Sequence, residues 1–283
     1  MDKIGLQLYS LGSDSPLSLL EKISLAGEMG FSGIEFAGGY DDISAEELIE
    51  AMKKAGVTAQ SAHVGVDAME KQFPYLAKLG VRRVICPMSS FNTPEEAKEL
   101  AGDLNRLGKI AAEYGMKTGY HNHTDEFYKV DGRYLYDYLI ENTNPEYVEF
   151  QIDCGWASAA EIDPVAYINQ HAGRICSIHV KENSDVIGAE KPPSRHGKSM
   201  LDDLERDENG RPILPPEFLE KMEERDKLNV ATGSGIVDWK AVKAAADAQM
   251  DNVIYIVERE ANYGSLDRAS CIKNDIAWIK DNL

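Results

Sequence analysis

Four apolar, strand-like runs in this sequence each end at a side chain that can bind a metal ion. The runs are Lys117–His123 (KTGYHNH), Val148–Asp153 (VEFQID), Arg174–His179 (RICSIH) and Asn252–Glu258 (NVIYIVE). In a closed barrel of parallel strands the carboxyl ends of all strands meet at one rim, so these four ends would lie together. Two imidazoles and two carboxylates are a suitable ligand set for Mn²⁺, Co²⁺, Zn²⁺ or Fe²⁺. The pattern therefore predicts a metal site, and with it an enzyme.

Side chains two residues apart on a strand face the same side, and this rule adds candidates to the site. The pairs that it brings together are His121 with His123, Gln151 with Asp153, and His179 with Lys181. Two more polar residues end earlier strand-like runs: Glu35 the second and His63 the third. Polar side chains at strand ends, above apolar ones, are what a barrel needs to carry a site on top of a packed core.

Each of these residues also has a purely structural explanation. A single histidine at a strand end is more often a hydrogen-bonded structural residue than a metal ligand. A strand-end carboxylate such as Asp153 can instead cap the helix that follows it. The coincidence of ligand-type residues at the last four strand ends favours a shared metal site, because clustered His, Asp and Glu mark functional sites.

Composition narrows the class of protein. The chain of 283 residues has a formal net charge of −18, which disfavours a nucleic acid or an anionic membrane as partner, because such partners need clustered Lys and Arg. Its 4 cysteines show no CxxC spacing, so we expect reduced thiols. We find no basic-then-apolar leader and no apolar stretch of about 18 residues, and therefore expect a cytoplasmic protein.

Capping signals mark the predicted helices. Four helical patterns stop at a glycine that an apolar run follows at once, and these glycines are Gly30, Gly56, Gly80 and Gly115. Helix starts are predicted at Ser15-Pro16 and Thr93-Pro94, where a capping hydroxyl precedes a proline. Capping boxes are predicted at Ser44–Glu47 and Thr93–Glu96.

Eight strand-like runs alternate with amphipathic helical patterns, which indicates a parallel sheet. The runs are Ile4–Tyr9, Gly33–Phe36, Thr58–His63, Arg83–Cys86, Lys117–His123, Val148–Asp153, Arg174–His179 and Asn252–Glu258. Eight such units predict an α/β fold closed into a (β/α)8 TIM barrel, as one domain over residues 1–283. An open doubly wound sheet is the alternative, but no GxGxxG motif follows the first run.

One long connection, residues 182–232, follows the seventh strand-like run and is predicted to be an insertion. Connections of this length in a compact domain are usually active-site lids or disordered segments, and its position on the predicted catalytic rim suggests a lid. A mobile surface loop is an equally good interpretation. The Gly233-Ser234-Gly235 turn that comes next would either cradle a phosphate or, more commonly, form a plain entry to a helix.

Five motifs in order resemble a known family over nearly the whole chain. They are GYHNHTDEF (119–127), QIDCGW (151–156), IHVKE (178–182), GSGIVDW (233–239) and IVERE (256–260). The set is similar to the sugar phosphate isomerase/epimerase group of the xylose isomerase-like TIM barrels. That resemblance implies one divalent metal, most often Mn²⁺, with Mg²⁺ also possible. In the ketose epimerases of the group, Glu, Asp, His and Glu from strands five to eight bind the metal.

At three of the four ligand positions of the family this chain has the expected residue type, and by this resemblance the ligands are Asp153, His179 and Glu258. The first falls in the His-Asn-His phrase, where this chain has His121 in place of the usual Glu, and whether His121 or His123 is the ligand stays open. The epimerases are thought to use two glutamates as acid and base, and only Glu258 has an evident counterpart here. We expect His123 and Glu126 to orient His121.

The resemblance predicts an isomerase or epimerase that acts on a ketose or keto-sugar through an enediolate. The alternative is a lyase at the same metal site, either inosose dehydratase-like or eliminating the aglycone of a 3-keto-glycoside. A DNA-repair endonuclease is excluded because Trp156 stands where those enzymes carry a His ligand. A barrel that only binds would show no tight metal. We expect a small-molecule sugar as partner and allow for a homo-oligomer.

The predicted roles divide the candidate residues into three groups. The acid–base residues are Glu258, His123 and Glu35. The metal ligands are His121, Asp153, His179 and Glu258. The substrate contacts are His63, Gln151, Trp156, Lys181 and Glu126.

Overall fold

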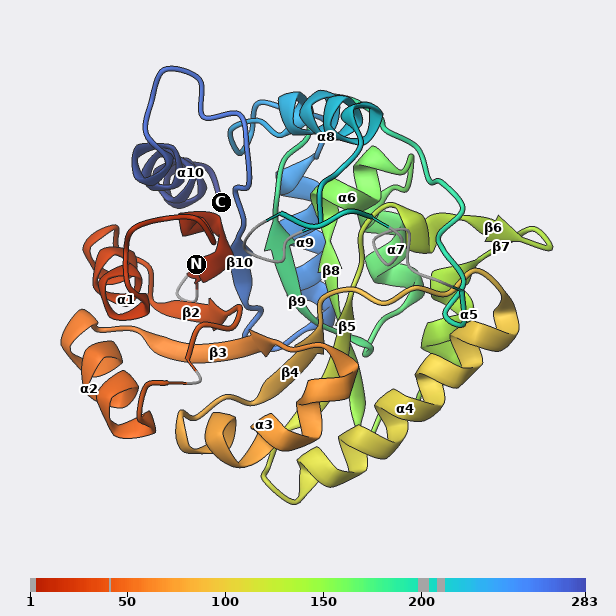
Figure 1. The fold of residues 1–283 in the computed structure, drawn as a ribbon, viewed down its shortest axis with the longest axis horizontal. Coiled ribbons are helices and arrows are strands. Elements are labelled where there is room, and N and C mark those ends of the chain that lie inside the picture. Colours follow the sequence, from red (N-terminus) through yellow and green to blue (C-terminus); the bar gives the residue numbers. More distant parts are fainter. Residues whose placement is uncertain (1–3, 41, 198–203, 208–211) are drawn as a thin grey trace.

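In the computed structural model, which describes residues 4–40, 42–197, 204–207 and 212–283, eight parallel strands close into a barrel surrounded by helices (Figure 1). The strands, in their order around the barrel, are β1 (Ile4–Gln7), β10 (Tyr255–Val257), β9 (Ile175–Val180), β8 (Val148–Asp153), β5 (Lys117–His121), β4 (Arg83–Cys86), β3 (Thr58–His63) and β2 (Gly33–Phe36). This arrangement confirms the (β/α)8 barrel. A two-stranded antiparallel sheet, β6 (Lys129–Val130) and β7 (Arg133–Tyr134), lies between β5 and β8 and was not predicted.

Helices occupy most connections between the barrel strands. They are α1 (Leu19–Glu28), α2 (Ala45–Ala55), α3 (Val66–Lys78), α4 (Pro94–Ala112), α5 (Leu135–Glu141), α6 (Cys154–Ala159), α7 (Pro164–Gln170), α8 (Pro216–Leu228), α9 (Trp239–Gln249) and α10 (Arg268–Asn282), with the 3-10 turns η1 (Leu8–Leu11) and η2 (Asp125–Phe127). The bounds of four strands differ from prediction. β9 is shifted by one residue at each end, and β10 is shorter than predicted at both ends, so that Glu258 directly follows it. β1 stops at Gln7 because η1 follows it, and β5 stops at His121, two residues before its predicted end.

The hydrogen bonds at the helix ends explain which of the predicted helix boundaries are correct. The Ser44 capping box forms, because the Ser44 hydroxyl accepts from Glu47 N–H and the Glu47 carboxylate accepts from Ser44 N–H. At Thr93 only half of the box forms, since Glu96 accepts from Asn92 N–H instead. The start predicted at Ser15-Pro16 is wrong, because α1 begins after Ser18, which forms a complete box with Glu21. The four predicted helix-ending glycines all adopt positive φ.

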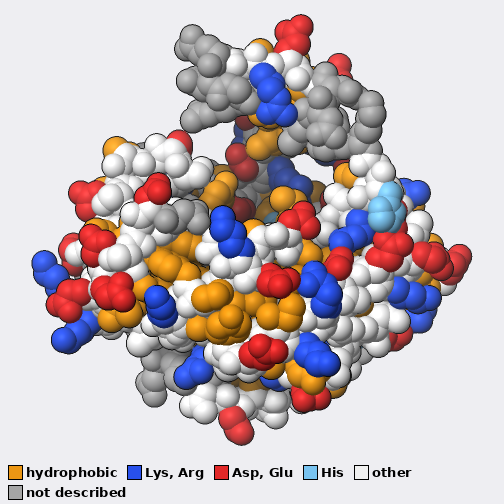
Figure 2. All heavy atoms as spheres, turned by 60° about the horizontal axis from the view of Figure 1, so that its bottom comes forward, with side chains coloured by type: hydrophobic (Ala, Val, Ile, Leu, Met, Phe, Trp, Pro, Cys, Tyr) orange, Lys and Arg blue, Asp and Glu red, His pale blue; other side chains and the backbone are white. Residues whose placement is uncertain are grey.

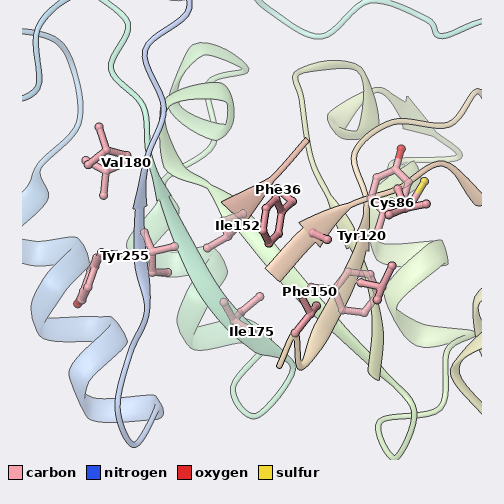
Figure 3. Close-up of a cluster of buried hydrophobic side chains, with 14 of the residues drawn as sticks. Phe36, Cys86, Tyr120, Phe150, Ile152, Ile175, Val180 and Tyr255 are labelled. Atoms are coloured by element: carbon pink, nitrogen blue, oxygen red, sulfur yellow. The ribbon is translucent and has the colours of Figure 1, made fainter. Parts of the chain in front are cut away.

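Strand alternation separates the core from the site. Phe150 and Ile152 of β8 lie in the buried hydrophobic cluster, together with Tyr120 of β5 (Figure 3). The residues that follow each of these two β8 side chains, Gln151 and Asp153, are buried polar groups. The rule that places residues two apart on one side therefore holds along β8, and it presents a polar pair at the carboxyl end of the barrel.

The long connection from β9 to α9 passes over the α4 side of the barrel. Of the predicted insertion, residues 198–203 and 208–211 lie outside the described part of the chain. Before that gap, the Arg195 guanidinium pairs with Asp103, and Arg195 N–H donates to Glu96 at 3.1 Å. His196 Nε2 lies 2.6 Å from Glu99 Oε2. Arg195 and His196 thus bind the acidic face of α4.

Within the described residues, we find no helix long and apolar enough to cross a bilayer.

Candidate metal centre

The four predicted metal ligands lie together at the carboxyl-terminal rim of the barrel. Their ligand atoms all lie within 4.8 Å of one another, and the four side chains, those of His121, Asp153, His179 and Glu258, are buried. His179 Nδ1 lies 3.4 Å from Glu258 Oε2 and 3.8 Å from Asp153 Oδ2. His121 Nε2 lies 4.0 Å from the same Asp153 oxygen. Nitrogen and oxygen donors this close can share one ion, and His123 is not part of the group.

The two carboxylate oxygens of Asp153 have different surroundings. Oδ1 accepts a hydrogen bond from Trp156 N–H at 2.7 Å and so caps α6. Oδ2 is buried and has no hydrogen-bond partner among the described residues. A buried carboxylate oxygen without a partner is costly, and a metal ion would supply the missing partner. The donor set therefore fits a divalent ion, and the capping role of Asp153 holds at the same time.

The pKa values of the cluster are strongly shifted. Burial raises the pKa of the Asp153 carboxyl to about 7. Burial alone would lower the pKa of His179, but the carboxylates of Glu35 and Glu258 raise it to about 10. Burial alone would raise the pKa of Glu258, but Lys181 and His179 hold it well below its usual value. Buried groups with such shifts, gathered at a barrel rim, are typical of a functional site.

Glu35 lies beneath the metal ligands and is closed to solvent. Its carboxylate accepts hydrogen bonds from Gln7 Nε2 at 2.7 Å, from Ser61 Oγ at 2.5 Å and from Gln151 Nε2 at 2.7 Å. Its Oε1 lies 2.8 Å from His179 Nε2. Burial alone would raise the pKa of Glu35, but nearby histidine rings lower it to about 2. These contacts contradict the predicted acid–base role and suit the orientation of the His179 ring, because a ligand histidine usually needs an acceptor on its other nitrogen.

Gln151 also lies below the ligands and does not face the pocket, where it was predicted to contact substrate. It is fully buried, and its Oε1 lies 3.0 Å from His121 Nδ1 and 2.8 Å from His63 Nε2. Gln151 therefore orients His121, a role that we predicted for His123 and Glu126. His121 Nε2 is left to face Asp153.

His63, His121 and His179 form a second group whose ring nitrogens are close enough for an ion. In this group both ring nitrogens of His63 already have neighbours, Gln7 at 3.1 Å and Gln151 at 2.8 Å. The group that contains Asp153 is the better candidate, because its carboxylate oxygen still lacks a partner.

A cavity of about 350 Å³ opens above the ligands, and its lining includes Tyr9, His63, His123, Glu258 and Glu260. Figure 2 shows that one side of the surface is deeply hollowed, with hydrophobic and charged side chains in the wall. The Nδ1 atom of His123 is buried without a hydrogen-bond partner among the described residues. Burial lowers the pKa of His123 to about 3. His123 and Glu258 thus both reach the pocket, as predicted.

Lys181 and Trp156 form one side of the site. The Lys181 ammonium is fully buried, pairs with the Glu260 carboxylate, and lies 4.6 Å from the centre of the Trp156 ring. The Arg225 guanidinium lies 4.4 Å from the same ring. Because Trp156 is only 7% exposed, it offers a sugar little surface for stacking, although it lines a second cavity beside the site, and its contact with substrate stays a prediction. Lys181 is held in place by Glu260, a residue the sequence did not assign.

Glu126 fixes the backbone that carries His123. Its carboxylate accepts hydrogen bonds from Tyr120 Oη and from His123 N–H, both at 2.7 Å. Burial raises the pKa of Glu126 to about 7. The residue contacts neither the His121 ring nor the metal cavity, although it lines a neighbouring cavity of about 260 Å³.

The Gly233–Gly235 turn does not form a phosphate site, because a carboxylate fills it. Glu182 accepts hydrogen bonds from Gly233 N–H at 3.0 Å, Val237 N–H at 3.1 Å and Trp239 Nε1 at 2.6 Å. The plain helix-entry turn is therefore the correct interpretation.

Sequence reasoning missed Gln7, Ser61, Glu260 and Arg225. Gln7 could have been found by the rule that selected Glu35, since it is a polar residue at the end of the first strand. Glu260 stands two residues beyond Glu258 and could have been found by alternation. Ser61 stands two residues before His63 on β3 and could have been found by the same rule, whereas no local signal marks Arg225, which reaches the site only through the fold.

The fold and the donor cluster define a TIM barrel with a group of side chains at its carboxyl-terminal rim that could hold a metal ion. The chain belongs to the xylose isomerase-like TIM barrel family, whose model matches residues 23–282.

A curated relative and two solved structures illustrate the breadth of this family. The inosose dehydratase of Bacillus velezensis is 29% identical over 188 residues, which are 58% of this chain and 61% of that protein, or less than two thirds of its length. A sugar phosphate isomerase/epimerase from Parabacteroides distasonis superposes with a TM-score of 0.76 at 20% identity and covers 100% of this chain and 95% of that one. The IOLI protein with a bound zinc atom superposes with a TM-score of 0.70 at 15% identity, over 99% and 97% of the two chains. At these identities the two structures share the fold.

Proposed function

We propose that the protein is a metal-dependent lyase that removes a proton beside the carbonyl of a keto-sugar and expels a group from the neighbouring carbon. The observation that carries this proposal is the position of the two carboxylates assigned to proton transfer. Glu258 lines the pocket, whereas Glu35 is fully buried beneath His179. Elimination needs only one base, which removes the proton from the carbon beside the carbonyl. The epimerases instead place two glutamates on opposite faces of that carbon. The similarity to an inosose dehydratase supports the same choice.

In this proposal each residue has a defined task. A bound divalent ion, for which we propose Mn²⁺, would polarise the carbonyl and its neighbouring hydroxyl and stabilise the enediolate that forms. Glu258 takes the proton from the carbon beside the carbonyl. His123, whose buried ring is neutral, donates a hydrogen bond to the leaving oxygen, and the protonated Glu258 returns its proton to that oxygen, which departs as water or as an alcohol while a carbon–carbon double bond forms. Lys181, fixed by Glu260, stands beside Glu258 and favours its charged form.

Isomerisation or epimerisation is the second candidate function, and the position of His123 in the cavity favours it. Its buried Nδ1 has no partner among the described residues, and the side chain lines the same cavity as Glu258. If the neutral His123 ring relays a proton, accepting on one nitrogen and donating from the other, to the opposite face of the substrate or to a neighbouring carbon, the product is an isomer.

One experiment separates the two outcomes. Mn²⁺-loaded protein is incubated in D₂O with ketohexoses, inososes and 3-keto-glucosides, and the products are followed by NMR, with Asp153→Asn as the control. We expect a keto-enone together with released water or alcohol. A deuterated isomer would establish the isomerase instead. Absence of both proton exchange and product across the panel would refute the enzymatic proposal for these substrates.

A further inference from the structure

The metal cavity continues into a second and larger chamber. The two cavities share Tyr9, His123 and Glu260 as lining residues, and their volumes are about 350 Å³ and 600 Å³. Small-molecule pockets usually have volumes of about 300–1,000 Å³, so the metal cavity alone has room for a sugar ring. The second chamber is additional space that a free monosaccharide would leave unfilled.

Apolar side chains from one segment form a wall of this chamber. Leu214, Phe218 and Met222 line it, and the last two lie one turn apart on the same face of α8. The side chains are accessible, because Met222 is 44% exposed and α8 contributes no buried residue. Tyr9 is 46% exposed and stands where the chamber joins the metal cavity. Accessible apolar groups gathered around a cavity are typical of a binding surface.

The charges in the chamber disfavour an anionic ligand. Three carboxylates, those of Asp14, Asp226 and Glu260, line it, against the two guanidinium groups of Arg225 and Arg268. Both guanidinium groups already have neighbours. Arg225 donates to Thr124 Oγ1 at 3.1 Å and lies over Trp156, and Arg268 lies 3.7 Å from Asp14. The Glu260 carboxylate is itself paired with the Lys181 ammonium, so the charges around the chamber balance and give it no net positive charge that would attract a phosphate.

We propose that this chamber holds the uncharged, largely apolar aglycone of a keto-glycoside whose sugar ring occupies the metal cavity. The inference rests on the proposed lyase activity and names its leaving group. In a 3-keto-glycoside, the base takes the proton from C2, and the electron pair of that C–H bond forms the C1=C2 double bond. The C1–O bond to the aglycone breaks, and the aglycone takes one proton and leaves as an alcohol. The enone and the alcohol together contain all atoms of the substrate, so no oxidant or reductant is needed.

The test compares methyl and cyclohexyl 3-keto-glucosides, whose leaving alcohols have similar acidity, so that a rate difference reports binding of the aglycone. Burial of a cyclohexyl group in an apolar chamber should raise kcat/KM by about tenfold or more, mainly through KM. In the double variant Phe218→Ala/Met222→Ala we expect the ratio of the two kcat/KM values to fall towards one. Leu219→Ala is the matched control, since Leu219 is an exposed apolar residue of α8 that does not line the chamber.

Binding is also measured without turnover. Calorimetry with cyclohexyl glucoside, which lacks the ketone and does not react, should show weaker binding in the double variant than in the Leu219→Ala control. Equal kcat/KM for both keto-glucosides in the unmodified protein would overturn the aglycone site, although elimination from both would leave the lyase proposal intact. If neither compound nor any inosose loses its proton, the proposed function itself fails.

Discussion

The Nε2 atom of His179 lies 2.8 Å from Glu35 Oε1, and Glu35 is closed to solvent. This contact fixes which face of the imidazole looks into the site, because only Nδ1 is left to face Asp153 and Glu258. A carboxylate on the far nitrogen of a ligand histidine orients the ring and increases its basicity. Glu35 therefore belongs to the support of the metal site.

Replacement of Glu35 by Gln should weaken metal binding. We expect the affinity for Mn²⁺ to fall roughly 10- to 100-fold, because the His179 ring loses its charged acceptor. Metal affinity is measured by competition with a fluorescent chelator, with Glu149→Gln as the matched control, since Glu149 pairs with Arg83 and Lys117 outside the site. Unchanged affinity together with a large loss of turnover would restore the acid–base role of Glu35.

Metal content follows from the four ligands. Elemental analysis of metal-replete protein should give about one equivalent of divalent ion, lost in Asp153→Asn and in His179→Gln. His196→Gln is the control, because this exposed histidine pairs with Glu99 away from the cluster. Removal of the ion by a chelator should abolish proton exchange, and added Mn²⁺ should restore it. Full metal content in both ligand variants would refute the assignment.

Loss of His123 should affect chemistry without affecting the metal. His123→Ala should lower turnover by roughly 10²-fold, because the residue is the proposed hydrogen-bond donor to the leaving oxygen. The variant should keep the metal content of the unmodified protein, since His123 is outside the ligand group. A wild-type rate would remove this histidine from the mechanism.

Glu182 should be important for stability. Its carboxylate satisfies three donors, on Gly233, Val237 and Trp239, and its replacement by Ala leaves them buried without an acceptor. We expect the free energy of unfolding to fall by about 3 kcal/mol or more, measured by denaturant titration. Glu190→Ala should change it little, because Glu190 forms an exposed ion pair with Lys221. Similar values for both variants would contradict this role.

Thiol reactivity should be low near neutral pH. Burial raises the pKa of Cys86 and of Cys176 to about 12. The thiolate is the reactive form, so a raised pKa lowers the reactive fraction below pH 12, and labelling should become faster as the pH rises. In the native protein at pH 8, a disulfide reagent should label these two thiols slowly, and after denaturation it should count all 4 cysteines. Rapid labelling of Cys86 in the native protein would contradict its burial.

The fold was predictable because its signals are local. Strand-like runs and helix-ending glycines fix the barrel, and they require no knowledge of distant contacts. The ligand set was predictable for the same reason, since each ligand stands at a strand end. The role of Glu35 was not predictable, because the sequence pattern of a strand-end carboxylate is the same whether its side chain faces the pocket or lies beneath it. Its burial depends on Gln7, Ser61 and Gln151, which come from three other strands.

Asp153 joins the metal site to the proposed aglycone chamber. One of its oxygens faces the ligand cluster and the other holds the backbone of Trp156, whose side chain lines the chamber. If a bound metal ion shifts this carboxylate, its hydrogen bond to Trp156 N–H would transmit the shift to the chamber wall and couple the two sites. Thermodynamic linkage makes such coupling reciprocal, and an aglycone that binds metal-loaded protein more tightly must raise metal affinity by the same factor. The metal would then have a regulatory part as well as a chemical one, because its occupancy would set how well the protein recognises the leaving group of the substrate.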